Sequence, residues 1–463
     1  AHSAAADPDA FRLARSLGDP DQTWGSSLVD YDLDARADLL LNWHRARLPA
    51  VLRNLGSLTF GRPDIAWPYP MDRHGCAWGE ANGDGSPDLA CAQGAHGGHA
   101  EGPSELWSTD PWREWGVAAG IDNPLGRTRS VNWLDYDRDG RLDLFAGGIA
   151  RDRFGDQLYR NDGGTFTPVG AGISGLRRTV SSSWADWNRD RWPDLLLLQH
   201  ADGSNLRFYV NEGGRFSPTT FRATAGVWAS SAWGDFDGDG WPDLHLVGWS
   251  RSLVLRNDRG TLRPVSDMVL TRGRGSAWLD VNNDGLLDLY VVQSAPGKEP
   301  GAIGDAADLL LVQKAPGRFT KVALPQTAGW EGAGDAVAVG SLNDDYRVDA
   351  LVSNGRARWH GSQQLLLNRN RAGNAARLVL RGTRWNPLGF GARIRVVAGG
   401  ATRWRALTDG VAGMSQSSNI IHIGLGDAGS ARVTVRWSGG ACDELRIQAA
   451  TTRVLRIGSK GCG

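Results

Sequence analysis

Short apolar segments alternate with acidic turns along most of the chain. A small, aromatic segment precedes each turn, an apolar run such as residues 195–198 or 289–292 follows it, and a third segment such as 157–161 comes next. A Gly-rich turn then leads to a fourth segment, which begins at Phe166, Phe216 or Phe319. Four short strands in a unit of about 50 residues are typical of one blade of a β-propeller.

The acidic turn between the first two segments recurs seven times with the pattern D-x-D-x-D-G-x-x-D. Its copies begin at residues 30, 80, 135, 186, 235, 280 and 341, and the last copy is degenerate because Ser341 and Tyr346 replace its first acid and its glycine. The copies at 30 and 186 also lack the glycine and carry Ala35 and Arg191 instead. Repetition at a nearly fixed period predicts a repeat architecture for this part of the chain.

The two ends of the repeat array complement each other. The last unit has strand-like segments at 349–353 and 364–368 but ends before a fourth one. Phe11 precedes Asp30 by the same interval as Phe216 precedes Asp235, so residues 11–17 resemble the missing strand. We therefore predict an all-β fold in which residues 1–370 form a seven-bladed β-propeller. The N-terminal strand would close the ring, so that no sheet edge is left unpaired at the junction.

A different pattern begins after Asn368. Alternating apolar and polar positions at 377–380, 393–397, 420–423 and 433–437 predict strands, and no helical periodicity of useful length appears. Residues 371–463 are therefore expected to form a small β-sandwich-like domain.

The acidic turns have the composition of calcium loops. Oxygen ligands at alternating positions suit a hard cation, the glycine at the sixth position permits a sharp turn, and a carbonyl at the seventh can donate whatever its side chain is. Seven groups of carboxylates are also costly to hold together without a cation, which makes simple solubilising turns the weaker interpretation. We expect up to seven Ca²⁺ ions, held by Asp30, Asp32, Asp34 and Asp38; Glu80, Asn82, Asp84 and Asp88; Asp135, Asp137, Asp139 and Asp143; Asp186, Asn188, Asp190 and Asp194; Asp235, Asp237, Asp239 and Asp243; Asp280, Asn282, Asp284 and Asp288; and Asn343, Asp345 and Asp349.

With these loops the units resemble FG-GAP/VCBS repeats, the calcium-binding blades that are also found in integrin α-subunit heads. The resemblance covers about residues 9–370 and implies the same acids as ligands. Segments 386–393, 415–417 and 422–426 resemble the ASPIC/UnbV domain, which often follows such repeats, as in cartilage acidic protein and many bacterial exported proteins. That resemblance implies a fold and export but no defined activity.

Composition and cysteines bear on location. Lys and Arg balance Asp and Glu at a formal net charge of zero, so no global charge favours nucleic acid, and no apolar run is long enough for a membrane helix. Four cysteines allow three pairings, or four free thiols. Cys76 and Cys91 flank one acidic loop and Cys442 and Cys462 share the C-terminal domain, so we expect these two disulfides and a secreted, extracellular or periplasmic protein.

One further group of residues has metal-ligand chemistry. His96, His99 and Glu101 lie in a Gly-rich loop, and His74 precedes the neighbouring strand, so the four side chains are a candidate transition-metal site. The alternative is an ordinary exposed loop, and we regard His44 and His200 as ordinary residues. No catalytic motif was found among the nucleophile elbow, zinc, phosphate-loop and dinucleotide patterns.

Two functions fit these features. The first is a calcium-binding recognition, adhesion or scaffold protein that contacts protein, glycan or copies of itself through exposed Trp and Arg, with no nucleic-acid partner and no membrane insertion. The second is an exported enzyme that acts on a carbohydrate or small molecule at the propeller channel, with a metal near His96 and His99. The absence of a catalytic motif and the repeated binding loops favour the first function over an enzyme.

Overall fold

The computed structural model describes residues 10–44, 47–68, 70–94, 104–121, 127–148, 155–173, 176, 178–199, 206–221, 226–269, 273–296, 303–305, 307–324, 327, 334–355, 360–370 and 373–462. Strands are the main regular secondary structure of these residues, as predicted. The α-helix they contain, α1 (Gly116–Ala119), has four residues, and no helix in the described part is long and apolar enough to cross a membrane.

The first half of the repeat array forms four sheets, each from consecutive antiparallel strands. They are β2 (Ser27–Val29), β3 (Asp38–Leu41), β4 (Ala50–Asn54) and β5 (Phe60–Gly61); β6 (Arg73–Gly79), β7 (Asp88–Gln93), β8 (Glu105–Thr109) and β9 (Trp112–Glu114); β10 (Thr128–Leu134), β11 (Asp143–Gly148), β12 (Gln157–Asn161) and β13 (Phe166–Val169); and β14 (Thr179–Ala185), β15 (Asp194–Gln199), β16 (Leu206–Asn211) and β17 (Phe216–Thr219).

Three more sheets follow in the second half. They are β18 (Trp228–Gly234), β19 (Asp243–Gly248), β20 (Arg251–Asp258) and β21 (Thr261–Val269); β22 (Gly273–Leu279), β23 (Asp288–Pro296), β25 (Asp308–Ala315) and β26 (Arg318–Leu324), with β24 (Ile303–Asp305) paired to β23; and β27 (Ala336–Gly340), β28 (Asp349–Ser353) and β29 (Gly361–Asn368) with β1 (Phe11–Asp21). In every sheet an acidic turn joins the first strand to the second.

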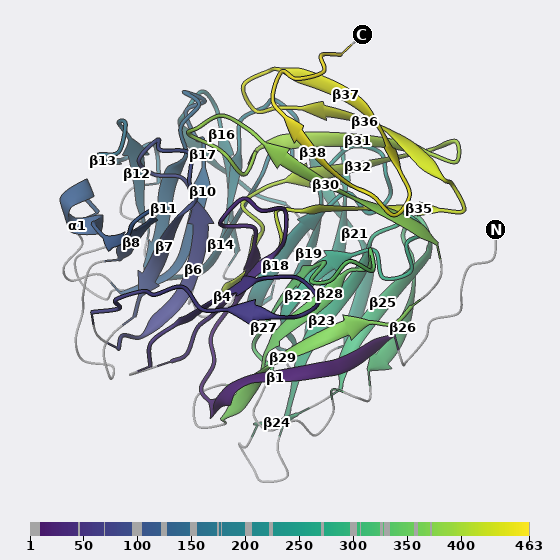
Figure 1. Cartoon of the computed structure of the whole chain (residues 1–463), viewed down its shortest axis with the longest axis horizontal. Helices are drawn as coiled ribbons and strands as arrows, with labels where there is room; N and C mark the ends of the chain where they lie inside the picture. Colours follow the sequence, from purple (N-terminus) through teal and green to yellow (C-terminus); the bar gives the residue numbers. More distant parts are fainter. Residues whose placement is uncertain are drawn as a thin grey trace.

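The N-terminal strand occupies the position predicted for it. β1 pairs antiparallel with β29 along its length, from Phe11 opposite Asn368 to Asp21 opposite Gly361. Figure 1 shows β1 in purple beside green β29, two strands from opposite ends of the repeat array. The sheet of β27, β28 and β29 therefore gains its fourth strand from the start of the chain.

The first strands of successive sheets face a common axis. They contact one another in the order β2, β6, β10, β14, β18, β22 and β27, and β27 contacts β2. In this propeller-like arrangement, the acidic turns that follow the first strands all lie at the same end of the axis. The count of seven blades and the closure of the ring stay predictions, which truncation of β1 tests.

Aromatic rings fill the space between neighbouring sheets. Trp133 and Trp278, two residues before an acidic turn, each lie against the glycine that ends the preceding first strand, Gly79 and Gly234. A Cβ at Gly79 would come within 2.3 Å of the Trp133 ring, so only glycine leaves room for it. The small and aromatic composition of these segments thus reflects packing between sheets.

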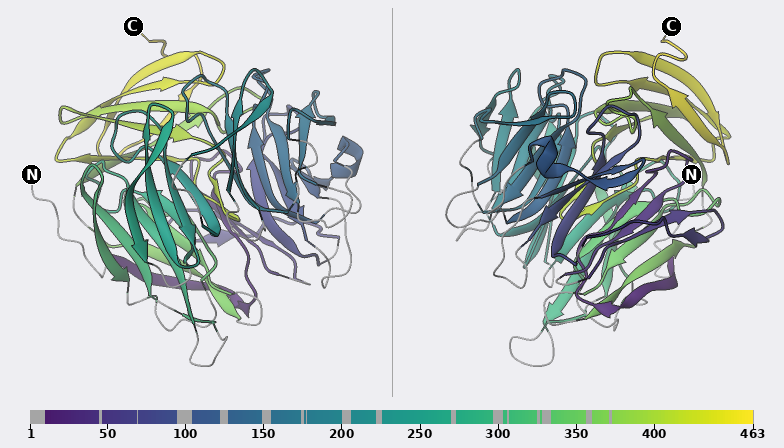
Figure 2. Two further views of the ribbon diagram at one scale, coloured as in Figure 1. Left: turned by 180° about the vertical axis from the view of Figure 1, so that it is seen from behind. Right: turned by 60° about the vertical axis from the view of Figure 1, so that its left-hand side comes forward.

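The C-terminal region contains two sheets of its own, as the predicted β-sandwich-like domain requires. One is β35 (Ile421–Gly426), β30 (Asn374–Arg381) and β38 (Thr452–Arg456); the other is β32 (Ala401–Leu407), β31 (Ala392–Ala398), β36 (Ser430–Arg436) and β37 (Cys442–Gln448). In both views of Figure 2 these yellow-green strands lie over one side of the repeat sheets. The proposed division at residues 370 and 371 stays a prediction.

One hairpin of this region leaves its own sheets and enters the axis of the propeller. β33 (Val411–Ala412) and β34 (Ser415–Gln416) pair with each other, and Gln416 pairs in parallel with Ser27 of β2. Gln416 also accepts from Trp78 N at 2.8 Å and donates to Trp78 O at 3.1 Å, and Asp409 accepts from Trp133 N at 3.1 Å. We call residues 409–419 the axial hairpin. No feature of the sequence pattern predicted it.

Both expected disulfides are present. Cys76 of β6 and Cys91 of β7 face each other across the two strands that flank the second acidic turn, and Cys442 is joined to Cys462. The first bond ties the two strands that position the turn, and the second ties the chain end to β37.

Candidate metal centres

The acidic turns share one hydrogen-bond pattern, which fixes their shape without any ligand. The fifth residue donates its backbone N–H to the third side chain, as Asp139 does to Asp137 at 3.3 Å. The seventh residue donates to the fifth, as Arg141 does to Asp139 at 2.9 Å, and the sixth donates to the first, as Gly140 does to Asp135 at 3.2 Å. The side chains at positions one, three and five therefore point into one small volume, as a cation site requires.

The ninth residue has a structural task that the sequence did not reveal. Asp243 accepts from Phe236 N at 2.9 Å with one carboxylate oxygen and from Asn257 N at 2.7 Å with the other. Asn257 in turn donates to Trp187 O of the preceding blade at 2.8 Å, so this Asp–Asn pair ties adjacent blades together. The same arrangement occurs with Asp38 and Asn54, Asp143 and Asn161, Asp194 and Asn211, and Asp349 and Asn368.

The turns without glycine adopt the same backbone as the others. Ala35 and Arg191 stand at the sixth position with φ of 72° and 77°, close to the 90° of Gly140. Non-glycine residues rarely adopt this conformation, because their Cβ crowds the backbone there. The missing glycine therefore changes the strain of these two turns and not their shape.

The carboxyl groups are strongly perturbed in the absence of an ion. Burial, with the neighbouring carboxylates, raises the pKa of Asp135 to about 7 and that of Asp235 to about 7. Burial also raises the pKa of Asp38 to about 8 and that of Asp243 to about 9, although backbone hydrogen bonds act in the opposite direction. A cation held between these carboxylates would lower their pKa values and favour the charged form.

Buried carboxylate oxygens occur in several of the turns. Asp88 Oδ1, Asp135 Oδ1 and Asp186 Oδ1 are buried and have no hydrogen-bond partner among the described residues, which is costly for a carboxylate unless an ion contacts it. The three groups Asp30, Asp32 and Asp38; Asp135, Asp137 and Asp143; and Asp235, Asp237 and Asp239 each place one ligand oxygen per residue within 4.8 Å of the others. These residues fit a calcium ion by donor type and by geometry.

The turns differ in what covers them. Arg381 of β30 reaches into the first turn and donates to Asp30 at 2.5 Å, so a guanidinium already neutralises that carboxylate. At the sixth turn, Gly424 lies so close to Asp280 that a Cβ would come within 1.8 Å of its carboxylate. Among the described residues, the first acids of the turns at 135 and 235 form no ion pair, and each of these turns also brings three carboxylates within 4.8 Å of one another, so they are the strongest calcium candidates.

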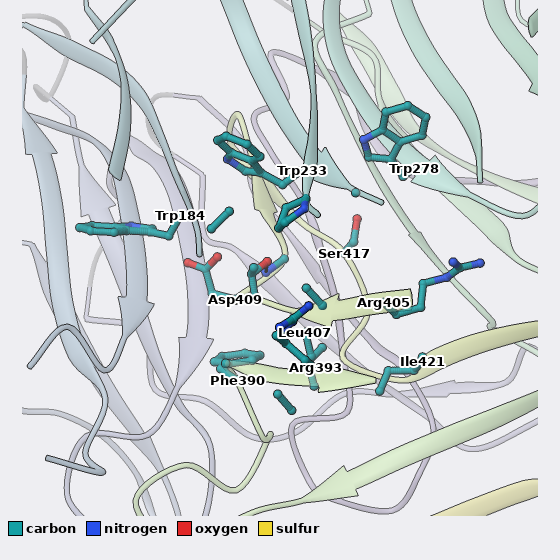
Figure 3. Close-up of a pocket in the computed structure, with 18 of the residues that line it drawn as sticks. Trp184, Trp233, Trp278, Phe390, Arg393, Arg405, Leu407, Asp409, Ser417 and Ile421 are labelled. Carbon is teal, nitrogen blue, oxygen red and sulfur yellow. Dashed lines mark hydrogen bonds between the residues drawn. The ribbon is translucent and has the colours of Figure 1, made fainter. Parts of the chain in front are cut away.

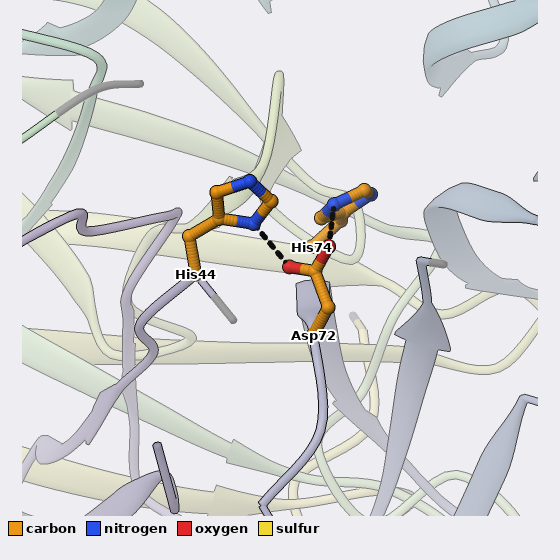
Figure 4. Close-up of side chains that lie close together, drawn as sticks. All are labelled: His44, Asp72 and His74. Atoms are coloured by element: carbon orange, nitrogen blue, oxygen red, sulfur yellow. Dashed lines mark hydrogen bonds and ion pairs between the residues drawn. The ribbon is translucent and has the colours of Figure 1, made fainter. Parts of the chain in front are cut away.

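A second cluster lies at the opposite end of the first strands, where Asp72 and His74 stand at the start of β6 and His44 follows β3. Figure 4 shows how the three side chains lie. His44 Nδ1 is in close contact with Asp72 Oδ1, and His74 Nε2 lies 2.9 Å from Asp72 Oδ2. Trp24 Nε1 donates to Asp72 at 3.3 Å, and Arg129 Nη1 lies 3.2 Å from His74 Nε2. We call His44, Asp72 and His74 the axial cluster.

Of the metal site predicted from the sequence, His74 is the member that the structure describes, and it lies in this cluster. His96, His99 and Glu101 fall outside the described residues, so the structure places His74 alone. His44, which the sequence analysis treated as ordinary, and Asp72 are the partners it missed. The D-R-H spacing of residues 72–74 was visible in the sequence, but His44 belongs to another blade and only folding brings it near.

A cavity separates the acidic turns from the C-terminal domain (Figure 3). Its volume is about 380 Å³, within the range of small-molecule sites. Trp184, Trp233 and Trp278 line it from the propeller, and Phe390, Arg393 and Arg405 line it from the other side. Both guanidiniums donate to turn carbonyls, Arg393 to Gly240 O at 2.8 Å and Arg405 to Gly285 O at 3.1 Å, so the cavity walls join the two regions.

Four-stranded sheets around one axis, each with an acidic turn at the same end, define a propeller-like repeat protein with an additional β-domain. Family models agree with this description. The model for the FG-GAP-like repeat matches residues 135–197, 186–246 and 235–291, and the model for ASPIC and UnbV matches residues 382–460. The chain therefore combines FG-GAP-like repeats with a C-terminal ASPIC and UnbV domain.

Other comparisons add little. No curated protein matches this chain. Among solved structures, the one titled "Crystal structure of BBS1N in complex with ARL6DN, soaked with lead" is similar over 79% of this chain and 96% of that chain, at 9% identity and a TM-score of 0.47. A likeness at this level carries no information about function.

Proposed function

We propose that this protein is an extracellular, calcium-loaded recognition or scaffold protein that acts through surface contacts. One observation carries the proposal: the acidic turns keep the same hydrogen-bonded shape around the axis, with buried carboxylates whose pKa values are raised. Such turns act as repeated rigid supports, and a ring of rigid blades presents a broad face better than a single tuned pocket. FG-GAP-like repeats and the two disulfides support an extracellular place of action.

The partner is a protein, a glycan or a second copy of this chain. Trp249 is exposed, and its ring lies over the guanidinium of Arg274 with 3.8 Å between the guanidinium carbon and the ring centroid. Trp and Arg are favoured anchors in interfaces because they combine a large contact area with hydrogen-bond donors. Trp107, in contrast, is buried, so it belongs to the core and not to a contact surface.

Binding screens in calcium and in EGTA test this function. Immobilised protein should retain a glycan or an extracellular protein in millimolar calcium and release it in EGTA, with only modest dependence on salt because the net charge is zero. Binding that survives calcium removal in a protein shown to have lost its ions would contradict the calcium-dependent part of the proposal.

Two matched variants test the loops themselves. Asp139 and Asp345 each accept from the backbone and the guanidinium of the arginine two residues on, so Asn at either position keeps a similar local pattern. Asp139→Asn should lower the calcium bound per chain by one ion. Asp345→Asn should leave it unchanged, because Ser341 replaces the first acid of that turn.

A second candidate function is an exported enzyme that acts on a carbohydrate or small molecule. The axial cluster favours it, because a histidine held by a buried carboxylate is a common general-base arrangement. A purified protein that consumes a small molecule, and loses this activity in His44→Ala, would replace the binding proposal.

A further inference from the structure

The axial cluster lies where the axial hairpin ends. The tip of the hairpin, Gly413 and Met414, reaches the amino-terminal ends of the first strands β2 and β6: a Cβ at Gly25 would lie 1.7 Å from Met414 O, and one at Gly75 would lie 3.6 Å from it. Trp24 and His74 are the next residues toward the amino ends of these strands. The cluster therefore occupies the axis just beyond the hairpin, on the side away from the acidic turns.

The three side chains arrive from two blades and are held in place. His44 follows β3, and its N–H donates to Gln22 O at 2.7 Å, next to the bridge between Thr23 and Trp43. Asp72 accepts Gly94 N at 2.7 Å through its carbonyl. A Cβ at Gly94 would come within 2.3 Å of His74 Cε1, so this glycine lets the imidazole lie flat against the chain. Rigid support of this kind is what a preorganised ligand set needs.

Among the described residues, the hydrogen-bond requirements of His74 are not met. Its Nε2 faces both a carboxylate, which requires a donor, and the Arg129 guanidinium, which is always a donor. If Nε2 carries the proton, it opposes Arg129. If Nδ1 carries it, Nε2 and Asp72 Oδ2 present lone pairs to each other at 2.9 Å, and the buried Nδ1–H has no acceptor. A cation shared by Nε2 and Asp72 removes the lone-pair conflict.

We propose that His44, Asp72 and His74 bind one divalent transition-metal ion at the axis of the propeller, separate from the calcium turns. Nitrogen and carboxylate ligands select ions such as Zn²⁺, Co²⁺ or Fe²⁺ over Ca²⁺, which takes oxygen ligands. Three protein ligands leave coordination positions open for water or a small molecule, as in catalytic and not in closed structural sites. The inference does not depend on the calcium proposal.

Arg129 is the natural competitor for this ion. Its guanidinium lies 3.2 Å from His74 Nε2 and 5.6 Å from the Trp24 ring centroid, and Asp335 contributes a nearby negative charge. A bound cation moves the guanidinium away from His74 and toward Asp335, whose Oδ2 is buried and has no hydrogen-bond partner within the described ranges. Removing the guanidinium should therefore tighten metal binding.

The experiment uses Co²⁺ as the probe on the full chain in millimolar calcium, with titration calorimetry, metal analysis and the visible absorption of bound Co²⁺. The expected result is one Co²⁺ per chain that excess calcium does not displace. Replacing a direct ligand should weaken binding by more than the roughly 10–100-fold that loss of a supporting residue costs, in both His44→Gln and His74→Gln. Arg129→Gln should bind Co²⁺ more tightly than the unaltered protein.

The control is His360→Gln, which removes an exposed histidine 3.6 Å from the carboxylate of Asp21 and should change nothing. His44 is partly exposed, so His44→Gln remains informative if His74→Gln fails to fold. No bound Co²⁺ in the unaltered protein, binding only in Arg129→Gln, or unchanged binding in His44→Gln would each overturn the proposal. None of these results bears on calcium-dependent stability, which is measured without transition metal.

Discussion

The two ends of the first strands carry opposite kinds of site. At the carboxyl ends the acidic turns repeat one oxygen-rich arrangement, and the C-terminal domain covers them. At the amino ends lies the axial cluster, a group of two histidines and one aspartate without a repeat. A repeated turn can contribute the same stabilisation several times, whereas the axial cluster occurs once among the described residues and is therefore the better candidate for a specific chemical role.

The largest effect should follow from removing β1. Deletion of residues 1–21 exposes the edge of β29, which β1 covers from Phe11 to Asp21, and opens the ring. An exposed strand edge promotes aggregation, so the truncated protein should be insoluble or should unfold far below the full chain. Solubility and thermal unfolding by circular dichroism measure this. A truncated chain that melts like the full one means that β1 does not close the ring.

The next largest effect should be calcium removal, which affects only one end of the strands. Each occupied turn should stabilise the fold by about 2.7 kcal/mol at a free calcium concentration one hundred times its dissociation constant. Chelation should therefore lower the melting temperature markedly in scanning calorimetry. The same chelation in a protein with the axial cluster disabled by His44→Gln should cause the same loss. An unchanged melting temperature after proven ion removal would contradict the calcium assignment.

A smaller loss of stability should follow from removing a contact between the axial hairpin and the first strands of the propeller. Asp409 is buried and accepts from Asn132 Nδ2 at 2.8 Å and Trp133 N at 3.1 Å. Asp409→Ala leaves both donors unpaired at about 1–3 kcal/mol each. Chemical denaturation should show this loss, and Asp427→Ala, at a site with no described ion pair or side-chain hydrogen bond, serves as the control. Equal stability of the two variants would mean that water replaces the carboxylate.

The last comparison concerns pH and again separates the two ends of the first strands. Without ions, the folded pKa values of Asp135, Asp38 and Asp243 are about 7, 8 and 9, above their unfolded values. The folded state then binds more protons than the unfolded state, so the stripped protein loses stability as pH rises from about 5 to 9. Calcium should abolish this slope. Melting curves across this range test it, and a slope of the opposite sign would contradict the raised pKa values.

Local pattern was enough to predict the blades, since each strand and each turn depends on residues close in the chain. The acids at 135, 137 and 139 converge because their turn has only one compact shape, and Cys76 and Cys91 meet because the turn between them forms a hairpin. Even the role of β1 was predictable, because the repeat left one strand missing at the other end.

The axis of the molecule was decided only by the tertiary structure. The axial hairpin carries no repeat signal, and its fit depends on Gly25 and Gly75, which lie more than three hundred residues away in the chain. The tertiary structure likewise decides that His44 lies beside Asp72 and His74 of the next blade. Contacts between distant segments leave no periodic trace in one sequence, because nothing local requires them; the closing of the blades around a common axis creates them.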